Sequence, residues 1–84
     1  MEKLNKSDIL KIQILKQFKK KEIHYTASYL AGILDSKYET VHKALEFFYQ
    51  IDILDKDVKE HAEKNIVYYY ITEYGKYLLK SQKM

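Results

Sequence analysis

The first half of the chain carries apolar residues at helical spacing. Over residues 8 to about 20 they gather on one broad side, with Gln and Lys on the opposite arc, and Ser7 stands where it can cap this first helix. A second helix is predicted after Thr26, with a buried side made of Ala27, Leu30, Ala31 and Leu34. Gly32 within it costs about 1 kcal/mol relative to Ala, so we expect another backbone to approach closely there.

A third helix is predicted over residues 37–50. Ser36 and Glu39 have the spacing of a capping box, in which each side chain accepts a hydrogen bond from the other's backbone N–H, so this helix should begin sharply at Lys37. Asp35 and Ser36 alone would then separate it from the second helix. Its buried stripe comprises Val41, Ala44, Leu45 and Phe48. Its free side carries Glu39, His42, Lys43, Glu46 and Gln50.

After Asp52 the apolar period changes from helical to alternating. Residues 53–59 and 65–71 are rich in β-branched and aromatic side chains and indicate a hairpin with a polar tip at residues 60–64. Alternation places Tyr69 and Ile71 on the inward face. Residues 23–25 are long enough for a short bridging strand. Thr72 can cap a last helix, whose apolar side carries Tyr74, Tyr77 and Leu78.

The length and the missing residue types exclude several classes of protein. Eighty-four residues predict one domain over residues 1–84. The absence of Cys excludes a disulfide scaffold and a thiolate zinc site. The sequence also has no Gly-rich phosphate loop and no Ser with a matched His and acid, so it predicts neither an enzyme nor a cofactor. Glu39, His42 and Glu46 share one side of the third helix, but such a set without Cys or a second His predicts surface residues rather than a metal site.

No targeting or membrane signal is visible in the sequence. Its apolar runs are shorter than the roughly 18 residues that span a bilayer, and its first residues are polar where a secretory signal would be apolar. The sequence therefore predicts a soluble, cytoplasmic protein with no membrane partner.

The positive charge comes from lysine alone. Fifteen Lys and no Arg stand against 12 acidic residues, for a formal net charge of +3. Bidentate recognition of guanine by Arg is therefore excluded, and Lys remains as a point-charge donor. Lys16 and residues 19–21 form a cluster that either contacts phosphates or simply ends a helix in solvent, and the sequence does not decide between the two.

The order helix, short strand, helix, helix, strand, strand, helix resembles a winged helix-turn-helix. Two stretches of the chain carry the resemblance. The first is similar to the recognition helix of many bacterial and archaeal transcription regulators and comprises Ser36, Thr40, Val41, Lys43, Ala44 and Leu45. The other is similar to the wing and last helix of the MarR, PadR and related groups and comprises Tyr69, Ile71, Thr72 and Gly75. The resemblance covers about residues 7–80, and a small archaeal or archaeal-virus regulator would suit this length. It implies an α+β fold with a three-helix core, a β-hairpin wing and a C-terminal helix.

The resemblance also implies a function and a set of contacts. A helix-turn-helix inserts the start of its third helix in the major groove of double-stranded DNA, here through Lys37, Tyr38, Thr40, His42 and Lys43. The wing would approach the minor groove with Lys59 and Lys64. The implied protein is a sequence-specific DNA-binding transcription regulator. The alternative is a winged-helix module that binds another protein, because the third helix and the wing tip are formally neutral.

Surplus apolar residues near both ends predict a homodimer. They are Leu4, Leu10 and Ile14 near the start and Tyr74, Tyr77, Leu78 and Leu79 near the finish, of which all but Leu79 are predicted interface residues. A twofold interface pairing the first or the last helix would set two recognition helices about 34 Å apart, which matches one turn of DNA. The alternative is that these residues close a monomeric core.

Overall fold

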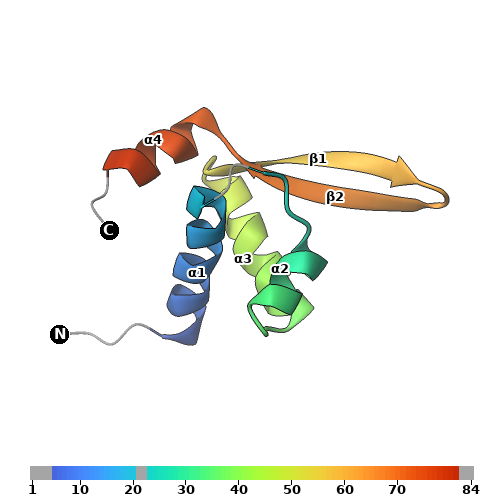
Figure 1. The fold of residues 1–84 in the computed structure, drawn as a ribbon, viewed down its shortest axis with the longest axis horizontal. Helices are drawn as coiled ribbons and strands as arrows, with labels where there is room; N and C mark the ends of the chain where they lie inside the picture. The colour runs from blue at the N-terminus through green and yellow to red at the C-terminus, as the bar shows by residue number, and fades with distance from the viewer. Residues whose placement is uncertain (1–4, 21–22, 82–84) are drawn as a thin grey trace.

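The protein has an α+β architecture of helices and one antiparallel hairpin. The structure, a computed structural model, describes residues 5–20 and 23–81. Its elements are α1 (Lys6–Lys20), α2 (Ala27–Ile33), α3 (Tyr38–Gln50), β1 (Leu54–His61), β2 (Lys64–Ile71) and α4 (Glu73–Ser81). Figure 1 shows the tip of the hairpin projecting well beyond α1, α2 and α3, with α4 at the opposite end of the molecule. No helix in the described ranges is long and apolar enough to cross a membrane.

The hydrophobic core lies where the first three helices meet the base of the hairpin. Its most deeply buried large side chains, among the described residues, are Tyr69, Phe18, Ile14, Leu30, Leu45, Leu54 and Val41. The predicted buried stripe of α3 is confirmed, because Val41, Ala44, Leu45 and Phe48 are all buried. The inward direction of Tyr69 and Ile71 is confirmed as well. The hairpin is therefore part of the core at its base and exposed at its tip.

Two helix caps were predicted correctly. The Thr26 hydroxyl accepts a hydrogen bond from the backbone N–H of Tyr29 at 3.1 Å, at the start of α2. Thr72 Oγ1 accepts from the N–H of Gly75 at 2.9 Å, at the start of α4. Each cap satisfies a backbone donor that the first turn of a helix leaves unpaired.

The start of α1 was predicted wrongly. The helix begins at Lys6, and Asn5 Oδ1 accepts from the N–H of Asp8 at 2.8 Å, so that Asn5 rather than Ser7 is the cap. Asn is as good a capping residue as Ser, and sequence alone did not distinguish the two positions.

The capping box between α2 and α3 was also wrong. Four residues, 34–37, separate the helices rather than two, and α3 begins at Tyr38 with no side-chain cap on its described first turn. Asp35 takes a left-handed φ of 50°, and the Ser36 hydroxyl donates to the carbonyl oxygen of Leu34 at 3.2 Å. The turn therefore directs Ser36 back toward α2, away from the N–H of Glu39.

The hairpin follows the predicted pairing but is longer. Tyr69 lies opposite Lys56, and the pairing continues as far as His61 opposite Lys64, where a tip of unpaired residues was expected. Ala62 has a left-handed φ of 55°, which allows a tight turn to close the strands. The predicted short strand at residues 23–25 is reduced to a bridge between Tyr25 and Tyr69.

The two glycines differ in their surroundings, and one differs from the expectation. Nothing lies within 4 Å of a Cβ built on Gly32, so the predicted close backbone approach in α2 is wrong. A Cβ on Gly75 would instead collide with the carbonyl oxygen of Ile53 and lie 2.8 Å from Cγ1 of Ile71. The close approach is therefore at the first turn of α4, where the helix packs on the end of the hairpin.

This contrast predicts opposite effects for the same substitution. Gly75→Ala should lower the free energy of unfolding by about 1–3 kcal/mol, because a backbone atom blocks the new methyl group. Gly32→Ala should raise the free energy of unfolding by about 0.5–1 kcal/mol, because Ala loses less backbone entropy than Gly when it folds into a helix and the new methyl group has space at this exposed position. Urea unfolding of the two variants measures both values. A destabilising effect of similar size at both positions would contradict this packing of α4.

Candidate nucleic-acid interface

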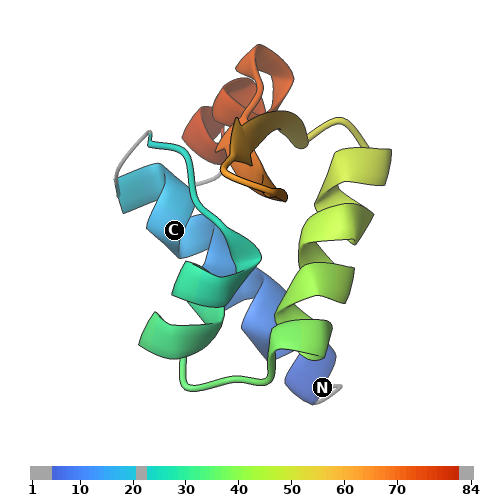
Figure 2. The ribbon, with the colours of Figure 1, turned by 90° about the vertical axis from the view of Figure 1, so that its right-hand side faces the viewer.

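The five residues predicted to read DNA all lie at the start of α3. Lys37 is its N-cap residue, and Tyr38, Thr40, His42 and Lys43 occupy its first two turns. Lys37, Tyr38, Thr40 and Lys43 are exposed and His42 is half-buried. Figure 2 looks toward the tip of the hairpin and shows α2 and α3 below it on either side. The start of α3 is thus a free surface on the side toward which the hairpin projects.

The side of α3 that faces the hairpin carries an aromatic pair. The rings of Tyr38 and His42 stack at 5.8 Å between centroids with an interplanar angle of 13°. They line a hollow of about 220 Å³ that also borders Ser28 at the start of α2 and Asn65 in β2. Polar groups from three elements therefore face one shallow space between α3 and the hairpin.

The two predicted hairpin lysines lie on the other face of the strands. Lys59 pairs with Ile66, three residues before Tyr69, and Lys64 is five residues before Tyr69. Because successive strand residues alternate, both lysines point away from the face that carries Tyr69. The ammonium of Lys59 lies 5.6 Å from the ring centroid of Tyr68 on that outer face. The five α3 residues therefore share one end of one helix, with Tyr38 and His42 toward the hairpin and Thr40 and Lys43 toward α1, while the two hairpin lysines lie apart from them.

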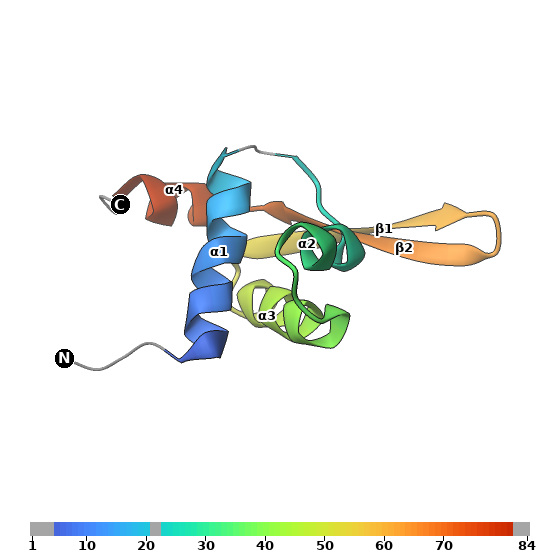
Figure 3. The ribbon, with the colours of Figure 1, turned by 60° about the horizontal axis from the view of Figure 1, so that its bottom comes forward.

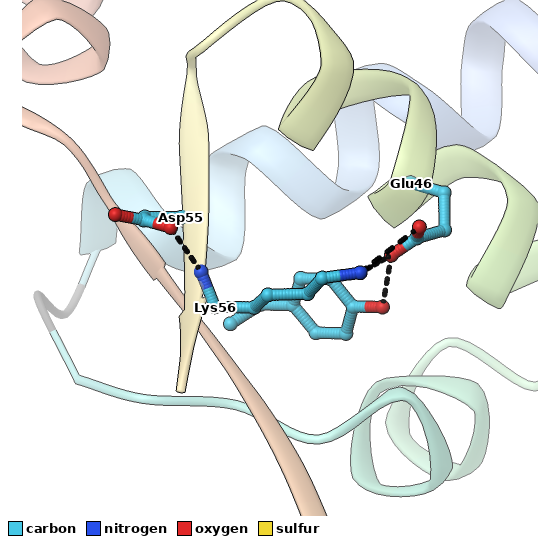
Figure 4. A network of polar contacts seen from close by, with 4 residues as sticks. Glu46, Asp55 and Lys56 are labelled. Carbon is cyan, nitrogen blue, oxygen red and sulfur yellow. Dashed lines mark hydrogen bonds and ion pairs between the residues drawn. The ribbon is translucent and has the colours of Figure 1, made fainter. Parts of the chain in front are cut away.

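Glu46, expected on the free side of α3, instead joins that helix to the hairpin. Its Oε2 accepts a hydrogen bond of 2.6 Å from the Tyr69 hydroxyl of β2. Its two carboxylate oxygens lie 3.2 and 3.1 Å from Nζ of Lys56 in β1. Figure 4 shows Glu46 and Lys56 facing each other across the gap between α3 and β1. We call these three residues the Glu46 network.

The electrostatics of the network favour the charged carboxylate. The Tyr69 hydrogen bond, together with Lys56, holds the pKa of Glu46 below its ordinary value of 4.5, although partial burial acts in the opposite direction. Burial, followed by the neighbouring Glu46, raises the pKa of the Tyr69 hydroxyl well above its usual range. Tyr69 is therefore a neutral donor and Glu46 a charged acceptor near neutral pH.

Two lysines from other elements add positive charge to the surface of α3. The ammonium of Lys11 in α1 lies 4.1 Å from the ring centroid of Phe47, and that of Lys56 lies 4.3 Å from the ring centroid of Tyr49. Figure 3 shows α1 and α3 next to each other at a steep angle. Within α3 and its N-cap, two lysines and two glutamates balance, so Lys11 and Lys56 are positive charges that other elements add beside this helix. Sequence reasoning missed both lysines, because no local pattern links them to α3.

Solved structures of other proteins have a similar fold. A possible transcriptional regulator from Methanosarcina mazei Go1 matches 90% of this chain with a TM-score of 0.75 and 15% sequence identity. A point mutant of Lactococcus lactis ZitR matches 95% with a TM-score of 0.70 and 20% identity. Stf76 from the Sulfolobus islandicus plasmid-virus pSSVx matches 87% with a TM-score of 0.67 and 14% identity. The fold is a winged helix.

The likeness is one of fold rather than of sequence. No protein-family model matches the chain, and no curated protein sequence matches it significantly. The chain spans 62% of the Methanosarcina protein and 53% of ZitR, but 94% of Stf76. By position in this fold, the hairpin corresponds to the wing and α3 to the helix that is named the recognition helix in winged-helix proteins, and both names are used here for position only.

The residues predicted for a dimer interface are split by the structure. Leu10 and Ile14 are 6% and 0% exposed because they lie in the chain's own core. They therefore present no surface to a second copy, and their place in the predicted interface was wrong. Tyr74 and Tyr77 on α4 are 53% and 67% exposed, and Leu78 is half-buried. Leu4 lies outside the described residues.

Proposed function

We propose that the protein is a transcription regulator that binds specific sequences in double-stranded DNA. The observation that carries the proposal is the exposed start of α3 on a winged-helix frame, where Lys37 and Lys43 lie and where Lys11 of α1 lines the same hollow as Lys43. An α-helix with its side chains is about 10–12 Å across and the major groove is about 12 Å wide, so α3 fits this groove. The match to a possible transcriptional regulator supports the same function.

The side chains on α3 have the chemistry for this role. Lys43 and Lys37 can donate to the acceptor atoms of guanine or to phosphates, and Thr40 can meet a thymine methyl group. Tyr38 and His42 border the hollow beneath the wing and can donate to the backbone on that side. The absence of Arg weakens each guanine contact, so specificity should depend on several modest contacts.

The wing contributes by proximity to the minor groove. Lys59 and Lys64 lie on its outer face near the tip, so they would contact phosphates at the edge of the groove rather than enter it beside α3. This contribution should be sequence-independent.

A gel-shift titration with duplex DNA tests the proposed function. Binding to a random duplex should weaken between about 50 and 200 mM salt, because each neutralised phosphate contributes about 0.9 to the slope of log affinity against log salt. Selection from a random library should then give a preferred site that, at the higher salt concentration, binds more tightly than the random duplex does. Failure to bind any duplex at the lower concentration would instead favour a module that binds protein.

Assembly as a homodimer would complete this function. One recognition helix covers few base pairs, and two copies on adjacent half-sites would raise affinity and specificity together. Tyr74 and Tyr77 are exposed three residues apart on α4, beside half-buried Leu78. An α4 pair about a twofold axis would cover these rings.

Sedimentation equilibrium at micromolar concentration tests the dimer. The parent should have the mass of two chains, and Tyr77→Lys should have the mass of one, because a buried charge without a partner opposes association. Tyr29→Lys is the matched control, since Tyr29 is 55% exposed on α2 and lies outside this interface. A parent mass of one chain, unchanged by palindromic DNA, would exclude the dimer.

A further inference from the structure

A second hollow lies on the side of the recognition helix that faces away from the wing. It has a volume of about 270 Å³ and lies between α1 and α3. Its lining residues are Ser7, Lys11, Thr40, Lys43, Ala44 and Phe47. Two of them carry an ammonium group, two carry a hydroxyl group, and none of the six is acidic.

Phe47 explains why Lys11 lies over this hollow. Phe47 is 44% exposed on α3, and the face of its ring attracts the Lys11 ammonium at 4.1 Å. An apolar ring on the surface of the recognition helix thus positions a cation from another element beside Lys43.

The chemistry of the hollow suits a phosphate group. Lysine ammonium groups and Ser or Thr hydroxyl groups are among the donors that proteins direct at phosphate oxygens in DNA. The two donors from α1, Ser7 and Lys11, face two from α3, Thr40 and Lys43, so an anion between the helices would be approached from both sides.

We propose that this hollow binds a backbone phosphate of the DNA whose major groove the recognition helix enters. A groove is bordered by a phosphate backbone on each side, and a helix that fills its width lies close to both. The wing and the start of α2 lie on one side of α3, and the hollow lies on the other. The site rests on the proposed function and adds α1 to the interface, through Lys11 in its first half rather than through the lysine cluster at its end.

The test replaces one lysine and compares salt dependence. Lys11→Met keeps most of the side chain over Phe47 and removes the charge. It should lower the salt slope by about 0.9 and weaken binding about fivefold at about 0.15 M salt, by the same factor for preferred and random duplexes. Lys16→Met is the matched control, because Lys16 is exposed on the same helix and does not line the hollow. It should bind like the parent, and Lys11→Arg should restore the slope.

The outcomes separate this site from the proposed function. If Lys43→Ala weakens binding and Lys11→Met does not, the recognition helix reads DNA and the hollow is not a phosphate site. If Lys11→Met and Lys16→Met weaken binding equally, the effect is one of total charge and the site is again overturned. If the parent binds no duplex, the function itself fails. Inorganic phosphate, added at the concentration of the DNA phosphate groups in the binding experiment, should leave the amide NMR signals of Ser7 and Thr40 unshifted. Shifts of these signals that saturate with inorganic phosphate would instead assign the hollow to a small anion.

Discussion

Tyr69→Phe is expected to lower the free energy of unfolding by about 1.5–3 kcal/mol, which is the usual contribution of a hydrogen bond to a charged group. The Tyr69 hydroxyl donates to the Glu46 carboxylate at 2.6 Å, and the Tyr69 ring is 1% exposed. The substitution leaves the ring in the core and removes only the donor. Urea unfolding at neutral pH measures the loss.

Tyr68→Phe is the matched control, and pH provides a second readout. Tyr68 points to the outer face of the wing, so its substitution should change stability little. The depressed pKa of Glu46 gives stability that is present above its ordinary value of 4.5 and is lost as the pH falls through the lower value of the folded state. Tyr69→Phe should therefore cost less at acidic pH than at neutral pH. Equal costs at both pH values, or equal costs for Tyr68→Phe and Tyr69→Phe, would contradict the Glu46 network.

The double variant Lys37→Ala/Lys43→Ala is expected to show the largest loss of DNA binding. Both lysines are exposed at the start of the recognition helix. Each lost base contact should cost about 1–3 kcal/mol and relax specificity, and each lost phosphate contact should lower the salt slope by about 0.9. Fluorescence anisotropy with the preferred duplex at several salt concentrations separates the two kinds of contact.

The control for this variant removes the same charge elsewhere. Lys16→Ala/Lys80→Ala changes two exposed lysines on α1 and α4, and it should retain most of the affinity. Circular dichroism should show that both double variants keep the fold, because none of the four side chains is buried. Binding of Lys37→Ala/Lys43→Ala equal to that of the parent would show that α3 is not the reading element.

Periodicity was sufficient to predict the parts of the fold that depend on burial. Val41 and Leu45 recur at helical spacing and Tyr69 and Ile71 at strand spacing, and each is buried as predicted. These predictions succeed because one buried face fixes the phase of each element.

Features that depend on how elements cross could not be predicted. Lys11 and Lys56 lie over Phe47 and Tyr49 only because α1 and β1 pass next to α3. Leu10, which looked surplus while each helix was considered alone, is buried in the assembled core. The narrower likeness to the MarR and PadR groups, and an archaeal or viral origin, stay predictions, because matches at 14–20% identity show the fold alone.

The most direct test of the central claim is an amide NMR titration of the protein with its selected duplex. The largest shifts should occur at residues 37–43 of the recognition helix, with smaller shifts at the wing tip near Lys64 and at Lys11. The signals of α4 should change little between free and bound dimers. Shifts confined to α4, or no shifts when the duplex is in excess over the protein, would contradict the claim that α3 reads DNA.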